Sequence, residues 1–304
     1  MDIANEGLER QRAKRKRVAR MKKMIVSTLL IFILITTCVM TFLVIEVISL
    51  QKQLDALTAN MAVAETVEDT EEMVDDSFLD NVYLVDNIDN IAEEGDIPLV
   101  YLTFDDGPSE NTDAILDILD DYNVKATFFV VGQDTEIYGD EYRRIVDEGH
   151  TIGMHSYSHN YSKIYQSSDS FIADYNKIHD LILDVTGVDT KYYRFPGGSS
   201  NKVSNSSMSV FINYLNQEGA VYYDWNVASG DATSQAFTAD ELVDNVMKDV
   251  VKYKTSVVLL HDASNKDATV EALPRLIESL NEAGAMILPI TDDTTIIQHV
   301  SVVQ

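Results

Sequence analysis

Two adjacent carboxylates are the first candidates for chemistry in this sequence. Asp105 and Asp106 follow the apolar run 99–102, and Gly107 and Pro108 come directly after them. The apolar run is typical of a buried strand, which the polar stretch after it ends. Neighbouring carboxylates repel each other unless a cation offsets their charge. A divalent cation bound by one of them would leave the other free as a base, although the same residues are also common in a solvated turn.

Histidines further along the chain could bind such a cation. His155 and His159 are four residues apart, a spacing that would bring them together on one turn of a helix. With Asp106 they would provide two nitrogens and one oxygen, and three protein ligands plus water make the open arrangement of a catalytic zinc site. His150 and His261 also lie near the ends of expected strands. The sequence therefore predicts a site for one divalent metal, zinc, which cobalt or nickel could replace.

Three more polar clusters follow expected strands. Arg194 precedes a Pro-Gly-Gly turn, and its guanidinium could hold a carboxylate while the N–H groups of the turn hold an oxyanion. His261 closes a strand of Val and Leu and is a candidate general acid, whose tautomer a carboxylate would hold. The stretch 224–231 combines Trp225 with two aspartates. Taken singly, each cluster also fits a strand followed by a turn.

Together these clusters resemble the polysaccharide deacetylase family, also called carbohydrate esterase family 4 or the NodB homology domain. The resemblance extends over residues 97–290, and all five motifs of the family appear in the family's order. It implies a distorted (β/α) barrel of seven or eight strands. The five motifs are Thr103–Gly107, His155–His159, Arg194–Gly198, Asp224–Asp231 and Leu259–Asp262.

The resemblance also implies a role for each residue of the site. Asp105 resembles the general base, Arg194 the residue that pairs with it, and His261 the general acid. Asp231 matches the aspartate that orients this histidine. The implied metal ligands are Asp106, His155 and His159, and the implied substrate contacts are Gly197 and Leu259. Trp225, an aromatic residue of the fourth cluster, could stack on a sugar ring.

Two departures from the family pattern affect the walls of the expected groove. The fourth motif usually has a second Asp and ends in Trp, where this chain has Ala228 and Ala232. The third often has an aromatic residue after its proline, where this chain has Gly197, whose N–H takes the place of the oxyanion donor. Leu259 matches the apolar residue that faces the acetyl methyl.

Other aromatic residues near the motifs could stack on sugar rings or pack in the barrel: Tyr157, Tyr161, Tyr192 and Tyr193.

Alternating strands and helices would position these clusters. Such alternation implies parallel strands covered by helices, in an α/β barrel or a doubly wound sheet, and about seven units favour the barrel. In barrels the active site forms where the strands end, which is where the clusters fall. The expected strands are 98–104, 125–131, 151–155, 191–195, 220–227, 255–261 and 285–290, and the expected helices are 112–122, 138–148, 169–186, 204–218, 238–253 and 267–283.

The amino-terminal part of the chain has a different composition. Residues 1–23 carry nine Lys or Arg, and residues 24–45 form an uncharged apolar run. The run is long enough to cross a bilayer, which takes roughly 20 residues. The basic tail before it predicts a cytoplasmic amino terminus and an exported remainder. A cleaved signal peptide and a buried core helix are the alternatives, but a signal h-region has only roughly 7–15 residues, so an uncleaved single-pass anchor is favoured.

The chain after the apolar run is strongly acidic. The formal net charge is −27, and no Lys or Arg occurs between Lys52 and Lys125. Residues 46–96 are therefore expected to form an extended stalk, whose apolar stretch 78–85 could add a strand to the next domain. No basic patch mixed with aromatic residues follows the apolar run, so nucleic acid is not an expected partner. The single cysteine, Cys38, leaves the exported part without a disulfide, as in bacterial surface proteins.

These observations give a functional hypothesis for residues 97–304. This catalytic domain would hydrolyse N-acetyl groups of a glycan at the cell surface, and the membrane anchor favours peptidoglycan N-acetylglucosamine as the substrate. Asp105 would take the proton of the attacking water, and His261 would protonate the sugar nitrogen. Three alternatives remain: an O-acetyl esterase of xylan-like substrates, a catalytically silent glycan-binding domain, and a structural surface protein. The sequence indicates no oligomeric state.

Overall fold

The computed structural model describes residues 82–84, 90–93, 95–204 and 206–302. By its contacts the chain divides into two units, Met1–Asp76 and Ser77–Gln304, and all described residues belong to the second. Within these residues, no helix combines the length and the apolar character that a membrane span requires. The basic tail 1–23, the apolar run 24–45 and most of the stalk 46–96 lie outside the described residues, so these assignments stay predictions.

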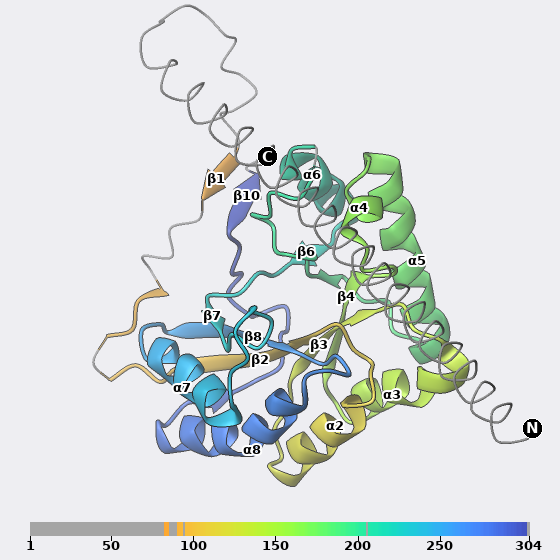
Figure 1. The fold of residues 1–304 in the computed structure, drawn as a ribbon. Coiled ribbons are helices and arrows are strands. Elements are labelled where there is room, and N and C mark those ends of the chain that lie inside the picture. The colour runs from red at the N-terminus through yellow and green to blue at the C-terminus, as the bar shows by residue number, and fades with distance from the viewer. Residues whose placement is uncertain (1–81, 85–89, 94, 205, 303–304) are drawn as a thin grey trace, which may run out of the picture. The chain divides into compact units, whose positions relative to one another are not determined.

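A curled parallel sheet organises the described unit. Its spatial order is β6-β5-β4-β3-β2-β8-β7, and β9 pairs with β2. No ladder joins β6 to β7 in the described part of the chain, so the sheet is a half-barrel that is open between its edge strands (Figure 1). The strands are β2 (Leu99–Asp105), β3 (Thr127–Val131), β4 (Thr151–Ser156), β5 (Tyr192–Tyr193), β6 (Val221–Tyr222), β7 (Val227–Ala228), β8 (Thr255–His261) and β9 (Met286–Ile287).

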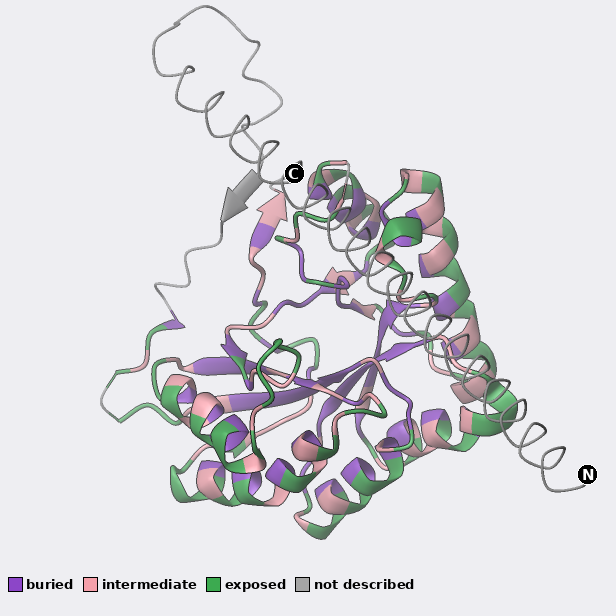
Figure 2. Cartoon of the chain, viewed as in Figure 1, coloured by how far each residue is buried: buried purple, intermediate pink, exposed green. Residues whose placement is uncertain are grey.

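Helices follow the strands, and the larger ones each bury one side and expose the other (Figure 2). The predicted alternation of strands and helices is therefore present. Gly187 and Gly219 end two of these helices at φ values of 74° and 72°, in the left-handed conformation that glycine adopts without strain. The helices are α2 (Thr112–Asp121), α3 (Thr135–Asp147), α4 (Tyr161–Ile164), α5 (Ser168–Thr186), α6 (Met208–Glu218), α7 (Ala239–Val250) and α8 (Asp267–Glu282).

The predicted strand 220–227 is wrong, because this stretch forms two short strands on opposite edges of the sheet. β6 pairs with β5, whereas β7 pairs with β8. The segment between them crosses from one edge to the other, and the side chain of Asn226 makes hydrogen bonds with the backbone of β8. The side chain of Asn226 donates to the carbonyl of Thr255 at 2.8 Å and accepts the N–H of Val257 at 2.8 Å. The chain therefore crosses between the two edges of the sheet where one continuous strand was expected.

The inner face of the half-barrel changes from apolar to polar along the strands. An inner cluster of buried residues contains Tyr101, Phe129 and Val257. Side chains alternate along a strand, so Thr103 and Asp105 lie on the same face of β2 as Tyr101. The other face of the sheet packs against the helices in a larger apolar core. Burial of both faces explains the continuous apolar runs in the sequence. The carboxylate of Asp105 and the imidazole of His261 lie at the last residues of their strands.

A small second sheet joins the two ends of the described unit. β1 (Val82–Leu84) pairs antiparallel with β10 (Val300–Val302), where an extra strand from 78–85 was expected. Asn90 adds a second connection, because its side chain donates to the carbonyl of Thr255 at 2.8 Å and accepts the N–H of Thr255 at 2.7 Å. The unit therefore includes residues ahead of 97.

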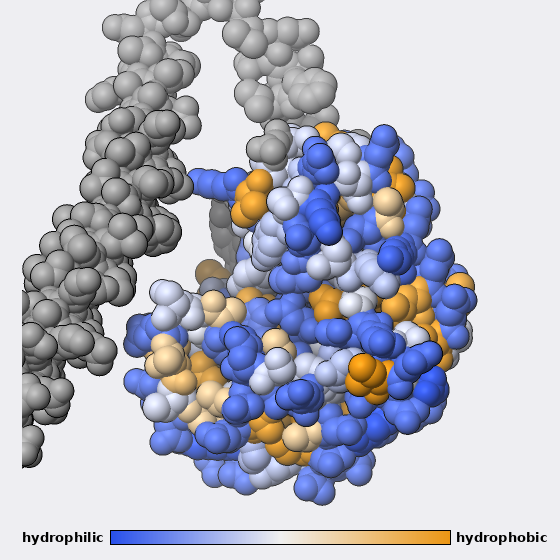
Figure 3. Space-filling view, turned by 45° about the vertical axis from the view of Figure 1, so that its right-hand side comes forward, coloured by the Kyte–Doolittle hydropathy of each residue, from blue (hydrophilic) through white to orange (hydrophobic). Residues whose placement is uncertain are grey.

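The surface shown in Figure 3 is largely hydrophilic, with apolar side chains scattered over it. Large apolar residues that are exposed include Ile137, Val203 and Val251, which belong to different parts of the chain. Single apolar residues of this kind are normal on protein surfaces and do not by themselves mark a binding site.

Candidate active site

The register of β2 and β8 places two predicted catalytic residues side by side. Asp105 and His261 are partners in this parallel ladder, and each is the last residue of its strand. Leu259, the partner of Thr103, lies two residues earlier on the same face as His261. The carboxyl ends of parallel strands meet at one edge of the sheet. The pairing alone therefore brings a carboxylate and an imidazole to the same end of the half-barrel.

Asp106, His155 and His159 converge beside this pair. One ligand atom from each of the three residues lies within 4.8 Å of the others. Oδ1 of Asp106 is 3.1 Å from Nε2 of His159 and 3.6 Å from Nε2 of His155. This oxygen is buried, and no described residue makes a hydrogen bond with it. An unpaired buried carboxylate oxygen is costly, so two imidazole nitrogens and this oxygen fit the binding of a divalent cation.

The two histidines are not on one helical turn, and that prediction is wrong. β4 continues through Ser156, so His155 lies on a strand and His159 lies in the loop after it. The hydroxyl of Ser156 accepts the N–H of His159 at 2.9 Å, which turns the loop back toward the strand. His159 and Asp106 have φ values of 42° and 75°, in the left-handed region that non-glycine residues rarely adopt. Backbone strain of this kind is concentrated at functional sites.

A hydrogen bond fixes the orientation of the His155 ring. Nδ1 of His155 is 2.7 Å from the backbone carbonyl oxygen of Arg194. A carbonyl oxygen can only accept, so Nδ1 carries the proton and Nε2 presents its lone pair toward Asp106. Burial lowers the pKa of His155 to about 3, which keeps the ring neutral near pH 7. Neutral imidazole is the form that binds a metal.

The guanidinium of Arg194 is buried and holds Asp105. It donates to Oδ1 of Asp105 at 2.9 Å and to the hydroxyl of Thr103 at 2.6 Å. It also donates to the backbone carbonyls of Tyr223 and Asp224, at 3.0 Å each. Burial raises the pKa of Asp105, and the charge of Arg194 opposes that shift. A carboxylate whose pKa is raised accepts a proton more readily, which suits a general base.

Asp231 holds the ring of His261. Nδ1 of His261 is 2.8 Å from Oδ1 of Asp231, and Oδ2 accepts the His261 N–H at 2.8 Å and the Thr269 hydroxyl at 2.9 Å. Burial favours the neutral ring, but the hydrogen bond and charge of Asp231 outweigh it and raise the pKa of His261. The pKa of Asp231 is lowered, because bonds from His261 outweigh the effect of burial. Both shifts favour an imidazolium paired with a carboxylate.

The site side chains line a hollow of about 330 Å³, which we call the catalytic hollow. Arg194 and Asp231 lie behind its lining, in contact with Asp105 and His261. All ten predicted site residues therefore come together in one place. The lining residues are Asp105, Asp106, His155, His159, Gly197, Trp225, Leu259 and His261, together with Tyr161, Ala232 and Lys266.

Gly197 occupies a position where a larger residue would be strained and would crowd Tyr161. Its φ is 78°, and a Cβ added there would lie 3.0 Å from the ring of Tyr161. In the described part of the chain, no backbone carbonyl accepts its N–H. Of the aromatic residues singled out from the sequence, Tyr161 and Trp225 line the catalytic hollow, while Tyr193 is buried in the core. Tyr161 thus occupies space next to the position where the family often has its aromatic residue.

Two carboxylates that support the site were not identified as supports from the sequence. Asp262 accepts the hydroxyls of Ser109 at 2.9 Å and Thr112 at 2.6 Å, and burial raises its pKa to about 7. Its own N–H donates to the carbonyl of Asp105 at 2.7 Å. A Cβ on Gly107 would lie only 2.2 Å from Oδ2 of Asp262, so only glycine fits there. Asp262 therefore fixes the loop that carries Asp106 against the end of β8.

The second supporting carboxylate is Asp174 on α5. Its Oδ2 accepts the hydroxyl of Ser156 at 2.6 Å and the N–H of Tyr157 at 2.8 Å, and its Oδ1 accepts the N–H of Ser158 at 3.0 Å. The hydroxyl of Ser156 in turn holds the backbone of His159. Asp174 therefore fixes the loop between the two histidines.

Replacing Asp174 by Ala is expected to weaken metal binding by about 10- to 100-fold, the usual effect of losing a residue that orients metal ligands. The loop that carries His159 would lose three hydrogen bonds. Titration of the metal-free protein with zinc would measure the affinity. Asp184→Ala removes an exposed carboxylate from the same helix and is the matched control. Equal zinc affinity of the two variants would contradict this role for Asp174.

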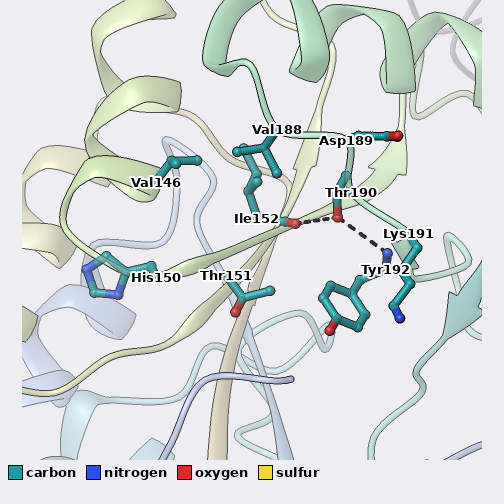
Figure 4. Close-up of a pocket in the computed structure, with 9 residues that line it drawn as sticks. All are labelled: Val146, His150, Thr151, Ile152, Val188, Asp189, Thr190, Lys191 and Tyr192. Atoms are coloured by element: carbon teal, nitrogen blue, oxygen red, sulfur yellow. Dashed lines mark hydrogen bonds between the residues drawn. The ribbon is translucent and has the colours of Figure 1, made fainter. Parts of the chain in front are cut away.

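A second hollow, of about 470 Å³, lies at the other ends of the strands (Figure 4). Two of its polar side chains, those of Thr190 and His150, make hydrogen bonds within the fold. The hydroxyl of Thr190 donates to the carbonyl of Ile152 at 2.7 Å and accepts the N–H of Tyr192 at 3.3 Å. Nδ1 of His150 accepts the N–H of Ala126 at 3.0 Å, and burial lowers the pKa of His150 to about 4. His150 therefore supports the fold through Nδ1, while its Nε2 is buried and no described residue makes a hydrogen bond with it.

Comparison with known proteins identifies the family. The sequence pattern of the family described as Polysaccharide deacetylase matches residues 92–211. The Bacillus subtilis protein YheN, which carries the polysaccharide deacetylase name, is 36% identical over 203 residues, covering 66% of this chain and 69% of YheN. A peptidoglycan-N-acetylglucosamine deacetylase of Bacillus cereus is 30% identical over 189 residues, covering 61% of this chain and 67% of that protein.

The solved structures show the same relationship. The catalytic domain of the peptidoglycan N-acetylglucosamine deacetylase from Eubacterium rectale superposes with a TM-score of 0.64 and 38% identity. The match covers 69% of this chain and 96% of that domain. The fold and the sequence thus point to the same enzymes, and the chain belongs to the polysaccharide deacetylase family.

Proposed function

We propose that this chain is a metal-dependent N-deacetylase of peptidoglycan N-acetylglucosamine. The observation that carries the proposal is the unpaired buried oxygen of Asp106, which faces the Nε2 atoms of His155 and His159. Asp105 and His261 lie at the same end of the sheet, so a base, an acid and a cation site share one hollow. The substrate is proposed because relatives named for this activity match the chain in sequence and in fold.

Each residue of the site has a distinct task in this reaction. Asp105 takes a proton from the attacking water, and the N–H of Gly197 donates to the oxyanion of the tetrahedral intermediate. His261 gives a proton to the departing sugar nitrogen, so the products are a free amine and acetate. When bound, a divalent cation supplies the Lewis acidity that polarises the acetyl carbonyl and acidifies water.

The proposed cation is zinc, because two imidazole nitrogens and one carboxylate oxygen with an open position form a typical catalytic zinc set. Cobalt or nickel could replace it, since sites of this ligand type bind these ions in the general order of affinity. We also propose that residues 24–45 anchor the chain in the membrane with the catalytic domain outside, as the basic tail before them indicates.

Analysis of treated glycan strands tests this function. Purified peptidoglycan treated with the full-length protein should lose acetyl groups from N-acetylglucosamine, as seen by mass spectrometry of the muropeptides. A chelator should abolish acetate release and added zinc should restore it. Release from acetylated xylan but not from N-acetylglucosamine polymers would instead favour the O-acetyl esterase. Glycan binding without any release would favour a silent binding domain, which the altered fourth motif allows.

Replacing Asp231 by Asn is expected to shift the alkaline limb of the pH profile to lower pH. The charge of Asp231 raises the pKa of His261, so its loss lowers that pKa. A general acid works only while protonated, so the variant should lose activity earlier as the pH rises. Measurement of kcat/KM from about pH 5 to pH 9 covers the range in which histidine titrates. A variant with reduced activity but an unmoved alkaline limb would contradict this role.

A further inference from the structure

A lysine lies in the wall of the catalytic hollow. Lys266 is the residue directly before α8, and its Nζ donates to the backbone carbonyl of Asp231 at 2.7 Å. It lines the catalytic hollow together with His261. It also lines a neighbouring hollow of about 270 Å³, which we call the side hollow. Lys266 therefore lies at the boundary between the place where the acetyl group would react and the space beside it.

The charge of Lys266 is available to a ligand. Its hydrogen-bond partner is a neutral carbonyl, and none of the ion pairs among the described residues includes it. An ammonium group has three donors, so two remain for a ligand. Arg194, the other cation at the site, is fully buried and its guanidinium bonds to Asp105, Thr103 and two carbonyls. Among the described residues, Lys266 is thus the lysine or arginine that lines the catalytic hollow, beside the imidazole of His261.

The lining of the side hollow has no free carboxylate that could neutralise the charge of Lys266. Asp231 belongs to its lining, but its side chain is only 4% exposed and its oxygens bond to His261 and Thr269. Other lining residues are the exposed and uncharged Thr233 and Ser234. Ala232 lies between Asp231 and Thr233 in the sequence and lines the catalytic hollow. Its side chain is one methyl group. A small side chain there leaves room for a substituent next to Lys266.

We propose that Lys266 binds a carboxylate of the glycan, on the reacting sugar or its neighbour, and so makes the enzyme prefer anionic glycans to neutral ones. This specificity role rests on the proposed function. The net charge of −27 would repel an anionic strand, and a cation in the catalytic hollow would offset this repulsion locally. Two sources share this chemistry: the lactyl carboxylate of muramic acid in glycan strands that have lost their stem peptides, and the carboxylate of a uronic acid.

Substitution of Lys266 tests the proposal through a ratio of specificity constants. Wild-type and Lys266→Met full-length proteins would be compared on three substrates: neutral N-acetylglucosamine oligomers, peptidoglycan strands freed of their stem peptides, and a polymer of N-acetylglucosamine and glucuronic acid. In the variant, kcat/KM for a carboxylated substrate relative to the neutral one should fall about tenfold, which corresponds to about 1.4 kcal/mol. The loss should appear in KM, and Lys266→Arg should restore most of it. The two carboxylated substrates distinguish the two sources.

The controls separate this role from a structural one. Lys266 bonds to Asp231, so the substitution could also disturb His261. Such a change would affect carboxylated and neutral substrates alike, so it would cancel in the ratio of their kcat/KM values. Lys248→Met removes the same charge from an exposed position on α7 and should leave the ratio unchanged. An unchanged ratio in Lys266→Met would overturn the proposal.

Measurements of glycan binding test the role of Lys266 independently of catalysis. If wild-type protein released no acetate from any substrate, the proposed function would fail. Calorimetric titration with the same three glycans would still decide the role of Lys266. A tenfold loss of the preference for a carboxylated glycan in Lys266→Met would support the role, and an equal preference in both proteins would overturn it.

Discussion

Asp105→Asn is expected to lower kcat by about 10²- to 10⁴-fold, the contribution that general base catalysis usually makes. An amide cannot accept a proton from water, but its oxygen can still accept the hydrogen bond that Arg194 gives to Oδ1. The fold and the metal site should therefore persist. Acetate release at saturating substrate would measure kcat, and zinc titration would measure metal binding.

Asp106→Asn is the matched comparison, since it changes the adjacent carboxylate. Asp106 belongs to the set of three converging ligands, so this variant should lose affinity for zinc as well as activity. Two results would contradict the separate roles of the neighbours. One is an Asp105→Asn protein that keeps its kcat, and the other is an equal loss of zinc binding in both variants.

Arg194→Met is expected to reduce the free energy of unfolding by about 3–5 kcal/mol, the usual cost of removing one partner of a buried ion pair. The side chains of Arg194 and Asp105 are 0% and 3% exposed. The substitution would leave the Asp105 carboxylate buried without its cation, and it would also leave the carbonyls of Tyr223 and Asp224 without donors. Urea unfolding, followed by circular dichroism, would measure the change.

Arg275→Met provides the control for Arg194→Met. Arg275 pairs with Asp240 on the surface, and both side chains are at least half exposed. Exposed pairs contribute only about 0–1 kcal/mol. Similar losses of stability in the two variants would show that burial does not govern the Arg194 contacts, which would contradict the prediction.

The parts of the site that the residues alone predicted are those set by one strand and its end. The pairings of Arg194 with Asp105 and of Asp231 with His261 came from the family resemblance. The apolar runs before Asp105 and His261 predict buried strands, and the polar residues after them fall at the edge where barrels bind substrates. The convergence of Asp106 with the two histidines was also expected from residue type. These expectations depend only on local pattern and on parallel strands ending together, so a sequence suffices for them.

Features that depend on pairing between distant segments were not predictable in the same way. The stretch 220–227 is apolar except for Asp224 and Asn226, and nothing in it shows that its two ends belong to opposite edges of the sheet. Asp262 bonds to residues 153 and 150 positions away, which no spacing rule indicates. The helical turn expected for His155 and His159 failed because β4 extends past His155. Tertiary contacts decided each of these cases.

One residue supports the base and a metal ligand at the same time. The backbone oxygen of Arg194 orients His155, while the guanidinium of the same residue holds Asp105. A small displacement of the chain at this point would therefore disturb proton abstraction and ion binding together. A shift of the backbone at this residue should impair both functions at once, whereas a side-chain substitution such as Arg194→Met removes, of these two contacts, only the one with Asp105.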